Sequence, residues 1–145
     1  MRAVVIPVAL LFSTLLGAAT ADSGAKVEYV GGTLNLKSGR DVSLQWGGAS
    51  ELEIGQVRVP WRQVNQIEYG QKVSRQVAAA ILVSPLFLLN KSRKHFLTLG
   101  YTDAQGQQQA VVLRVAKKNV RGMLASLEAR TGLRVSYQDD EARKM

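Results

Sequence analysis

Histidine is the side chain that most often carries acid–base chemistry near neutral pH, and this sequence has one, His95. A Ser/His/Asp scheme would have to use it together with a carboxylate. The next acidic residue along the chain is Asp103, roughly 26 Å away in a regular strand that rises about 3.3 Å per residue. A carboxylate from another strand stays open, but a lone histidine within a basic cluster is more typical of a surface residue. We therefore predict no catalytic residue.

Neighbouring carboxylates are the second arrangement that can do chemistry. Glu51 and Glu53 lie two apart and alternate with Leu52 and Ile54, which is typical of a half-buried strand with a solvated acidic face. The acidic residues 139–141 lack the oxygen spacing and the glycine of a calcium loop. The sequence therefore predicts no metal site.

Glycine-rich loops and cysteines add no further site. The pairs Gly31-Gly32 and Gly47-Gly48 stand between predicted strands, where they indicate turns rather than a phosphate-binding loop before a helix. The chain has no cysteine, so disulfides, thiolate metal sites and a cysteine nucleophile are excluded. We expect a protein that is not an enzyme and needs no cofactor.

Most of residues 27–115 follows a period of two, the pattern of strands with one buried and one solvated face. Pro60 cannot donate to a ladder, so its strand should end there or lie at a sheet edge. Residues 97–101 and 111–115 flank a turn at 103–106 and should pair as one hairpin. The apolar members of this pattern are Val27, Tyr29, Leu34, Leu36, Val42, Leu44, Trp46, Leu52, Ile54, Val57, Val59, Trp61, Val64, Ile67, Tyr69, Leu97, Leu99, Tyr101, Val111, Leu113 and Val115.

The period then changes to that of an amphipathic helix lying on a core. Asn119 is the expected N-cap and Gly132 the expected C-terminal cap. Residues 133–137 should add a last short strand, and the charged tail 139–145 should fray. The apolar helix positions, at i, i+3, i+4 and i+7, are Val120, Met123, Leu124 and Leu127.

One helix after many short strands predicts a mainly β (α+β) fold, a small antiparallel β-sandwich or open barrel capped by a C-terminal amphipathic helix. Residues 1–21 combine a positive start, an apolar run and a small-x-small cleavage pattern, which predicts a secretory signal peptide. The apolar run is shorter than the roughly 20 residues of a membrane span, so an uncleaved anchor is the weaker alternative. We expect one exported domain, residues 22–138, in the periplasm or cell envelope.

An apolar insert, residues 72–95, interrupts the predicted strands. Its centre, residues 77–89, is broken only by Ser84 and Pro85. A helix of this length would measure about 20 Å, against about 30 Å for the hydrocarbon core of a bilayer. A segment that is hydrophobic on every side must be covered by protein or by lipid. This segment is too short to span a bilayer comfortably as a single helix.

Two interpretations of the insert stay open. In the first it folds over an open end of the β-structure and joins the core. In the second it enters a membrane or a partner groove while its basic flanks meet anionic headgroups, and an apolar patch would equally serve a homo-oligomer. The candidate membrane- or partner-binding residues are Ile81, Leu82, Val83, Leu86, Phe87 and Leu88, and the candidate headgroup-binding residues are Lys72, Arg75, Lys91, Arg93 and Lys94.

The formal net charge of +8 favours anionic partners. Nucleic acid is not expected, because the basic residues are scattered, no module signature with interleaved aromatics is present, and the chain is predicted to be exported. An anionic lipid surface, an envelope protein or a second copy of the chain are the expected partners.

The order of elements resembles that of the bacterial PH-like and GRAM-like domains: several short strands, an apolar connection after Ile67-Glu68-Tyr69-Gly70, a hairpin, and a closing helix at residues 119–131. The resemblance covers most of the mature chain and rests on architecture. It implies a binding or scaffold role, in several cases at membranes, but the insert departs from the minimal domain and no ligand residue carries over. We therefore expect a non-enzymatic domain that docks at the envelope membrane through the insert; the alternative is a protein-interaction module or homo-oligomer that uses it as an interface.

Overall fold

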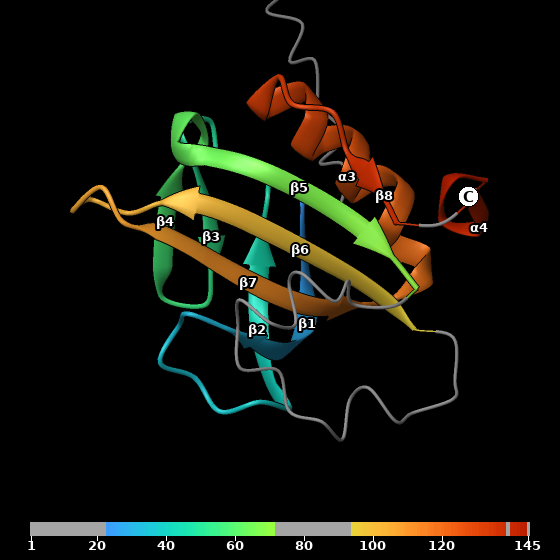
Figure 1. The fold of residues 1–145 in the computed structure, drawn as a ribbon, viewed down its shortest axis with the longest axis horizontal. Helices are drawn as coiled ribbons and strands as arrows, with labels where there is room; N and C mark the ends of the chain where they lie inside the picture. Colours follow the sequence, from blue (N-terminus) through green and yellow to red (C-terminus); the bar gives the residue numbers. More distant parts are fainter. Residues whose placement is uncertain (1–22, 72–93, 139, 145) are drawn as a thin grey trace, which may run out of the picture.

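A computed structural model describes residues 23–71, 94–138 and 140–144 (Figure 1). Its strands form one eight-stranded sheet in the order β4-β3-β2-β1-β7-β6-β5-β8. The elements are β1 (Gly24–Gly32), β2 (Arg40–Gln45), β3 (Glu51–Ile54), β4 (Val57–Pro60), the 3-10 turn η1 (Trp61–Gln63), β5 (Val64–Gly70), β6 (His95–Thr102), β7 (Gln108–Val115), α3 (Lys117–Thr131), β8 (Ser136–Tyr137) and α4 (Asp140–Arg143).

The sheet folds over on itself, since β5, β6 and β7 run across the view in Figure 1 while β1 and β2 run up it. β1 joins the two halves, because it pairs antiparallel with both β2 and β7. β4 lies at the edge of the sheet and ends at Pro60, as the missing donor of proline requires. The mainly β class, an open sandwich or barrel capped by a C-terminal helix, is confirmed.

The predicted hairpin is present as β6 and β7, in register from His95 opposite Val115 to Thr102 opposite Gln108. Asp103 holds its turn: Oδ1 accepts hydrogen bonds from the amides of Gln105 at 2.9 Å and Gln107 at 2.8 Å. The hydrogen bond from Gln107 is the main cause that lowers the pKa of Asp103 below its ordinary value.

Helix α3 packs its predicted apolar face on the sheet, but it begins earlier than predicted. Its N-cap is Ala116, which makes no side-chain capping bond, and Asn119 lies inside the first turn. The prediction of Asn119 as N-cap was wrong, because the helix also includes the polar residues 117–119, which precede its first buried apolar residue, Val120. Gly132 ends the helix with a φ of +73° and its amide donates to the Glu128 carbonyl at 2.9 Å, as predicted.

The expectation of one solvated face fails for β6, since all its residues from Phe96 to Tyr101 are buried. Phe96, Val30 and Val112 are three buried residues that lie outside the main core, and we call them the outer-face group. The period of two places them correctly on the opposite face, but it does not show that this face is also covered.

The C-terminal residues pack more closely than predicted. β8 adds to β5 as a parallel strand, with Tyr137 opposite Tyr69. Beyond it, Ala142 of α4 is 1% exposed and belongs to the main core. The tail therefore does not fray at Ala142, because this small apolar side chain is taken up by the core.

Candidate functional site

The candidate site lies at the end of the sheet from which the insert departs. Gln71 follows β5 and Lys94 precedes β6, and Gly70 and Phe96 are register partners on these neighbouring strands. Gln71 and Lys94, the two ends that residues 72–93 connect, therefore lie on neighbouring strands at the same end of the sheet. The candidates Ile81, Leu82, Val83, Leu86, Phe87, Leu88, Lys72, Arg75, Lys91 and Arg93 lie outside the described residues, as does the predicted signal peptide.

The same end of the sheet is strongly basic. His95 is the register partner of Val115, so Lys94 lies beside the start of α3. The first turn of α3 contains no acidic residue. The positive end of the helix dipole adds to this charge. We call the following group, of which the three α3 members are exposed, the basic end: Lys94, Lys117, Lys118 and Arg121.

His95 is paired with a phenol. The Tyr69 hydroxyl lies 2.5 Å from His95 Nδ1, and the two rings are stacked with their centroids 6.1 Å apart. Burial, with a further contribution from the charge of Lys117, lowers the pKa of His95 below 6.5. Asp103 lies beyond the opposite end of β6, so the two groups weighed as a catalytic pair are not brought together.

A groove of about 380 Å³ opens beside Lys94. Its charges are mixed, because Lys26 and Arg114 face Glu28 and Asp41 along it. Arg114 forms an ion pair with Glu28. The charges largely compensate one another within the groove, so it offers less attraction to an anion than the basic end does.

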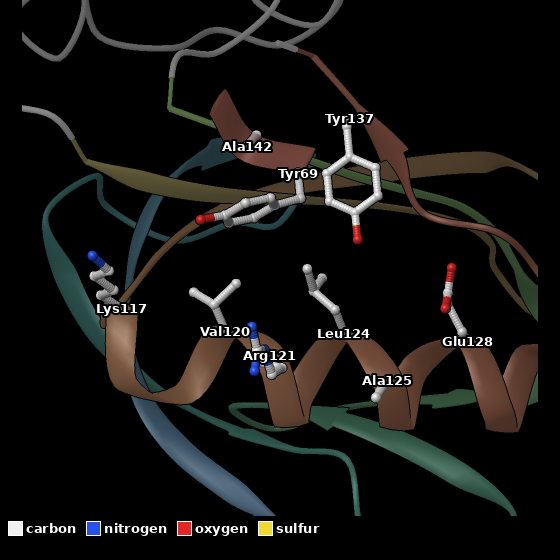
Figure 2. A pocket seen from close by; sticks show the side chains of 9 residues that line it. All are labelled: Tyr69, Lys117, Val120, Arg121, Leu124, Ala125, Glu128, Tyr137 and Ala142. Carbon is white, nitrogen blue, oxygen red and sulfur yellow. The ribbon is translucent and has the colours of Figure 1, made fainter. Parts of the chain in front are cut away.

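A second cavity, also of about 380 Å³, lies between α3, β5, β8 and α4 (Figure 2). Tyr69 and Tyr137 meet edge to face on one side, with centroids 6.1 Å apart. Val120 and Leu124 face them from α3. We call this space the helix cavity; within the described part of the chain its lining is Tyr69, Lys117, Val120, Arg121, Leu124, Ala125, Glu128, Tyr137 and Ala142.

Sequence reasoning missed the helix cavity because its walls come from elements far apart in the chain. Lys117 and Arg121 stand four apart and flank the apolar positions Val120 and Leu124, and this spacing places cations beside an apolar stripe. That signal was present in the sequence. The opposing wall of Tyr69 and Tyr137 depends on the parallel pairing of β5 with β8, for which two short strands give no clear pattern.

Glu51 and Glu53 lie on the solvated side of β3, as predicted. Arg58 of the neighbouring β4 contacts both, at 3.3 Å and 3.9 Å.

Across residues 23–71, 94–138 and 140–144, no three acidic or histidine side chains are grouped as metal ligands would be. No helix within these residues is long and apolar enough to cross a membrane.

Comparison of the chain with protein-family models, with curated proteins and with solved structures found no match.

Proposed function

We propose that the chain is an exported, non-enzymatic binding or scaffold domain that docks on the anionic face of an envelope membrane through residues 77–89. One observation carries the proposal: the connection that holds this apolar segment starts and ends beside the basic end of the domain. Apolar side chains can therefore enter the lipid at the place where Lys94, Lys117 and Lys118 reach the headgroups.

The two contributions are of the sizes that reversible docking requires. Each lysine or arginine near an anionic surface contributes about 1 kcal/mol. Burying one leucine or phenylalanine side chain contributes roughly 1.5–3 kcal/mol. Neither the charge contribution nor the burial contribution is sufficient alone once the translational and rotational freedom lost on binding is included. Attachment should therefore need both the apolar segment and the cations.

The architecture supports a binding rather than a catalytic role. The resemblance to PH-like and GRAM-like domains rests on the order of elements along the chain: several short strands, the connection after Gly70, the β6–β7 hairpin and the closing helix α3. A protein of this kind works by presenting surfaces and loops on a rigid sheet. We extend that role to this chain as part of the proposal.

Liposome flotation tests the proposal. The mature protein should float with vesicles that contain phosphatidylglycerol, and the double variant Leu82→Asp/Phe87→Asp should stay at the bottom. The control Gln105→Asp/Gln107→Asp adds the same charge on the exposed hairpin turn and should float like the unchanged protein. Equal flotation of all three proteins would overturn membrane docking through the insert.

A second candidate function is a protein interface or homodimer that uses the same segment. It is favoured by the outer-face group, since Phe96 follows the insert closely and is buried outside the main core, as are Val30 and Val112. Apolar surface from a protein partner or a second copy of the chain would enlarge the outer-face group at this place. Light scattering after size exclusion distinguishes the two: a dimer that the Leu82→Asp/Phe87→Asp variant abolishes supports the interface, and a monomer that floats with vesicles supports membrane docking.

A further inference from the structure

We infer that the helix cavity binds one medium-chain fatty acid, with its carboxylate at Lys117 and Arg121 and its hydrocarbon chain between α3 and the two tyrosines. This inference goes beyond membrane docking, because it assigns a soluble ligand to a cavity whose described lining comes from α3, α4, β5 and β8. The size, the chemistry of the walls and the order of the charges along α3 support it.

The size of the cavity fits a single chain. Small-molecule sites in proteins occupy about 300–1,000 Å³, and the volume of about 380 Å³ lies near the lower limit. One short hydrocarbon chain fits such a space, whereas the two chains of a phospholipid do not. The cavity therefore selects a free acid over an intact membrane lipid.

Part of the cavity wall is suited to hydrocarbon. Val120, Leu124 and Ala125 line it from α3, and Ala142 lines it from α4. These side chains offer no hydrogen bonds, so the backbone of a bound peptide would lose its hydrogen bonds to water without replacement, at a cost in free energy. An alkyl chain has no such groups.

Tyr137 adds a polar group to the wall of the cavity. Its hydroxyl points toward α3 in Figure 2 and makes no hydrogen bond to any residue within the described part of the chain. It lies on the same side as Glu128 rather than Lys117 in that view. The ring therefore supplies apolar surface to the chain, while its hydroxyl remains available to water at the far end.

The charges give the ligand a direction. Lys117 and Arg121 are one helical turn apart, and Glu128 follows two turns later, about 10 Å along the axis at 1.5 Å per residue. Glu128 is held in place because its Oε1 accepts a hydrogen bond from the Val135 amide at 2.9 Å. A carboxylate is attracted to the first two residues and repelled by the third, so the chain should point toward Glu128.

Isothermal titration of the mature protein with decanoate, below the concentration at which it forms micelles, tests this inference. We expect one saturable site for decanoate and at least tenfold weaker binding of decanol, which has the same chain without the charge. Decyl phosphate, which has the same chain with a phosphate headgroup, tests whether the site prefers a carboxylate to a phosphate. No saturable binding of decanoate, equal binding of decanol, or tighter binding of decyl phosphate would each overturn the assignment of a fatty acid.

Three variants locate the site. Lys117→Gln should weaken the binding of decanoate at least tenfold and leave the binding of decanol unchanged. The matched control is Lys118→Gln, in the same helical turn but outside the cavity lining, and it should leave the binding of both compounds unchanged. Ala125→Trp, at an exposed helix position, should fill the cavity and abolish binding of both compounds, with its helix content checked by circular dichroism. An equal effect of Lys117→Gln and Lys118→Gln would contradict the site.

The Leu82→Asp/Phe87→Asp variant separates this inference from the proposed function. It should lose flotation and retain decanoate binding, because it leaves Lys117, Arg121 and the two tyrosines of the cavity unchanged. Loss of decanoate binding in this variant would place the ligand at the insert and overturn the cavity assignment. Failure of flotation by the unchanged protein would overturn membrane docking and leave the decanoate result to stand by itself.

Discussion

Arg130 and Trp61 meet over the carbonyl of Gly48. The guanidinium carbon of Arg130 lies 5.7 Å from the centroid of the Trp61 ring. The Gly48 carbonyl accepts hydrogen bonds from Arg130 Nη1 at 2.7 Å and from Trp61 Nε1 at 2.9 Å. The last turn of α3 is thereby tied to η1 and to the loop between β2 and β3, so these contacts keep the helix across the open side of the sheet.

Arg130→Ala should lower the free energy of unfolding by about 1–2 kcal/mol, since it removes charged hydrogen bonds and a cation–π contact at a largely exposed site. The matched control is Arg62→Ala, which removes an exposed arginine of η1. It should change the free energy of unfolding by less than about 0.5 kcal/mol. Urea unfolding measures both. A double-mutant cycle with Trp61→Phe should show coupling; strict additivity would contradict the shared contact.

Gly32→Ala should destabilise the domain by about 1–3 kcal/mol, because the backbone at this residue is left-handed with a φ of +144° and a new Cβ would lie 2.3 Å from the Ala110 carbonyl oxygen. Gly39→Ala is the control. Its φ is +84° but no atom lies within 4 Å of the added Cβ, so it should suffer the backbone strain alone. Chemical denaturation should find Gly32→Ala the less stable of the two.

Gly122→Ala should stabilise the domain by about 1 kcal/mol, because alanine favours a helix interior over glycine by that amount. The exposed position in α3 has no atom within 4 Å of the added Cβ. Gly106→Ala is equally free of contacts but has a φ of +78°, so there the same substitution should destabilise. A rise in the thermal midpoint for the first variant and a fall for the second is expected; a fall for both would contradict this account of α3.

Acidification should destabilise the domain through His95. Its pKa is lowered in the folded state by burial and by Lys117, so below about pH 6.5 the unfolded chain binds a proton more readily than the folded one. Stability should therefore fall as the pH drops below about 6.5 and level off once the folded state is also protonated. Because His95 is the sole histidine, unfolding midpoints of His95→Gln should lack this step; an unchanged step in the variant would contradict the assignment.

Local patterns in the sequence were sufficient for much of the fold. The hairpin of β6 and β7 follows from alternation around a turn whose Asp103 and Gly106 suit its geometry, and α3 follows from four apolar residues at helical spacing. Pro60 marked an edge strand because proline cannot donate. In each case one short stretch contains the whole physical cause.

The features that the sequence did not reveal depend on contacts between distant stretches. Period two cannot show that Phe96 and Thr98 are covered on the outer face of β6. The capping of α3 by Ala116, without a side-chain bond, has no sequence signal. The helix cavity exists because the parallel pairing of β8 places Tyr137 beside Tyr69. The candidate insert residues were identified from composition alone, and their role stays a prediction.

Removing the insert is the most direct test of membrane docking. Since Gly70 and Phe96 are register partners, residues 72–93 can be replaced by a short Gly-Ser linker that closes β5 and β6 as an ordinary hairpin, with folding checked by circular dichroism. Flotation with phosphatidylglycerol vesicles is the measurement. The unchanged mature protein should float and the folded replacement should not; flotation of the replacement to the same extent would contradict docking through the insert.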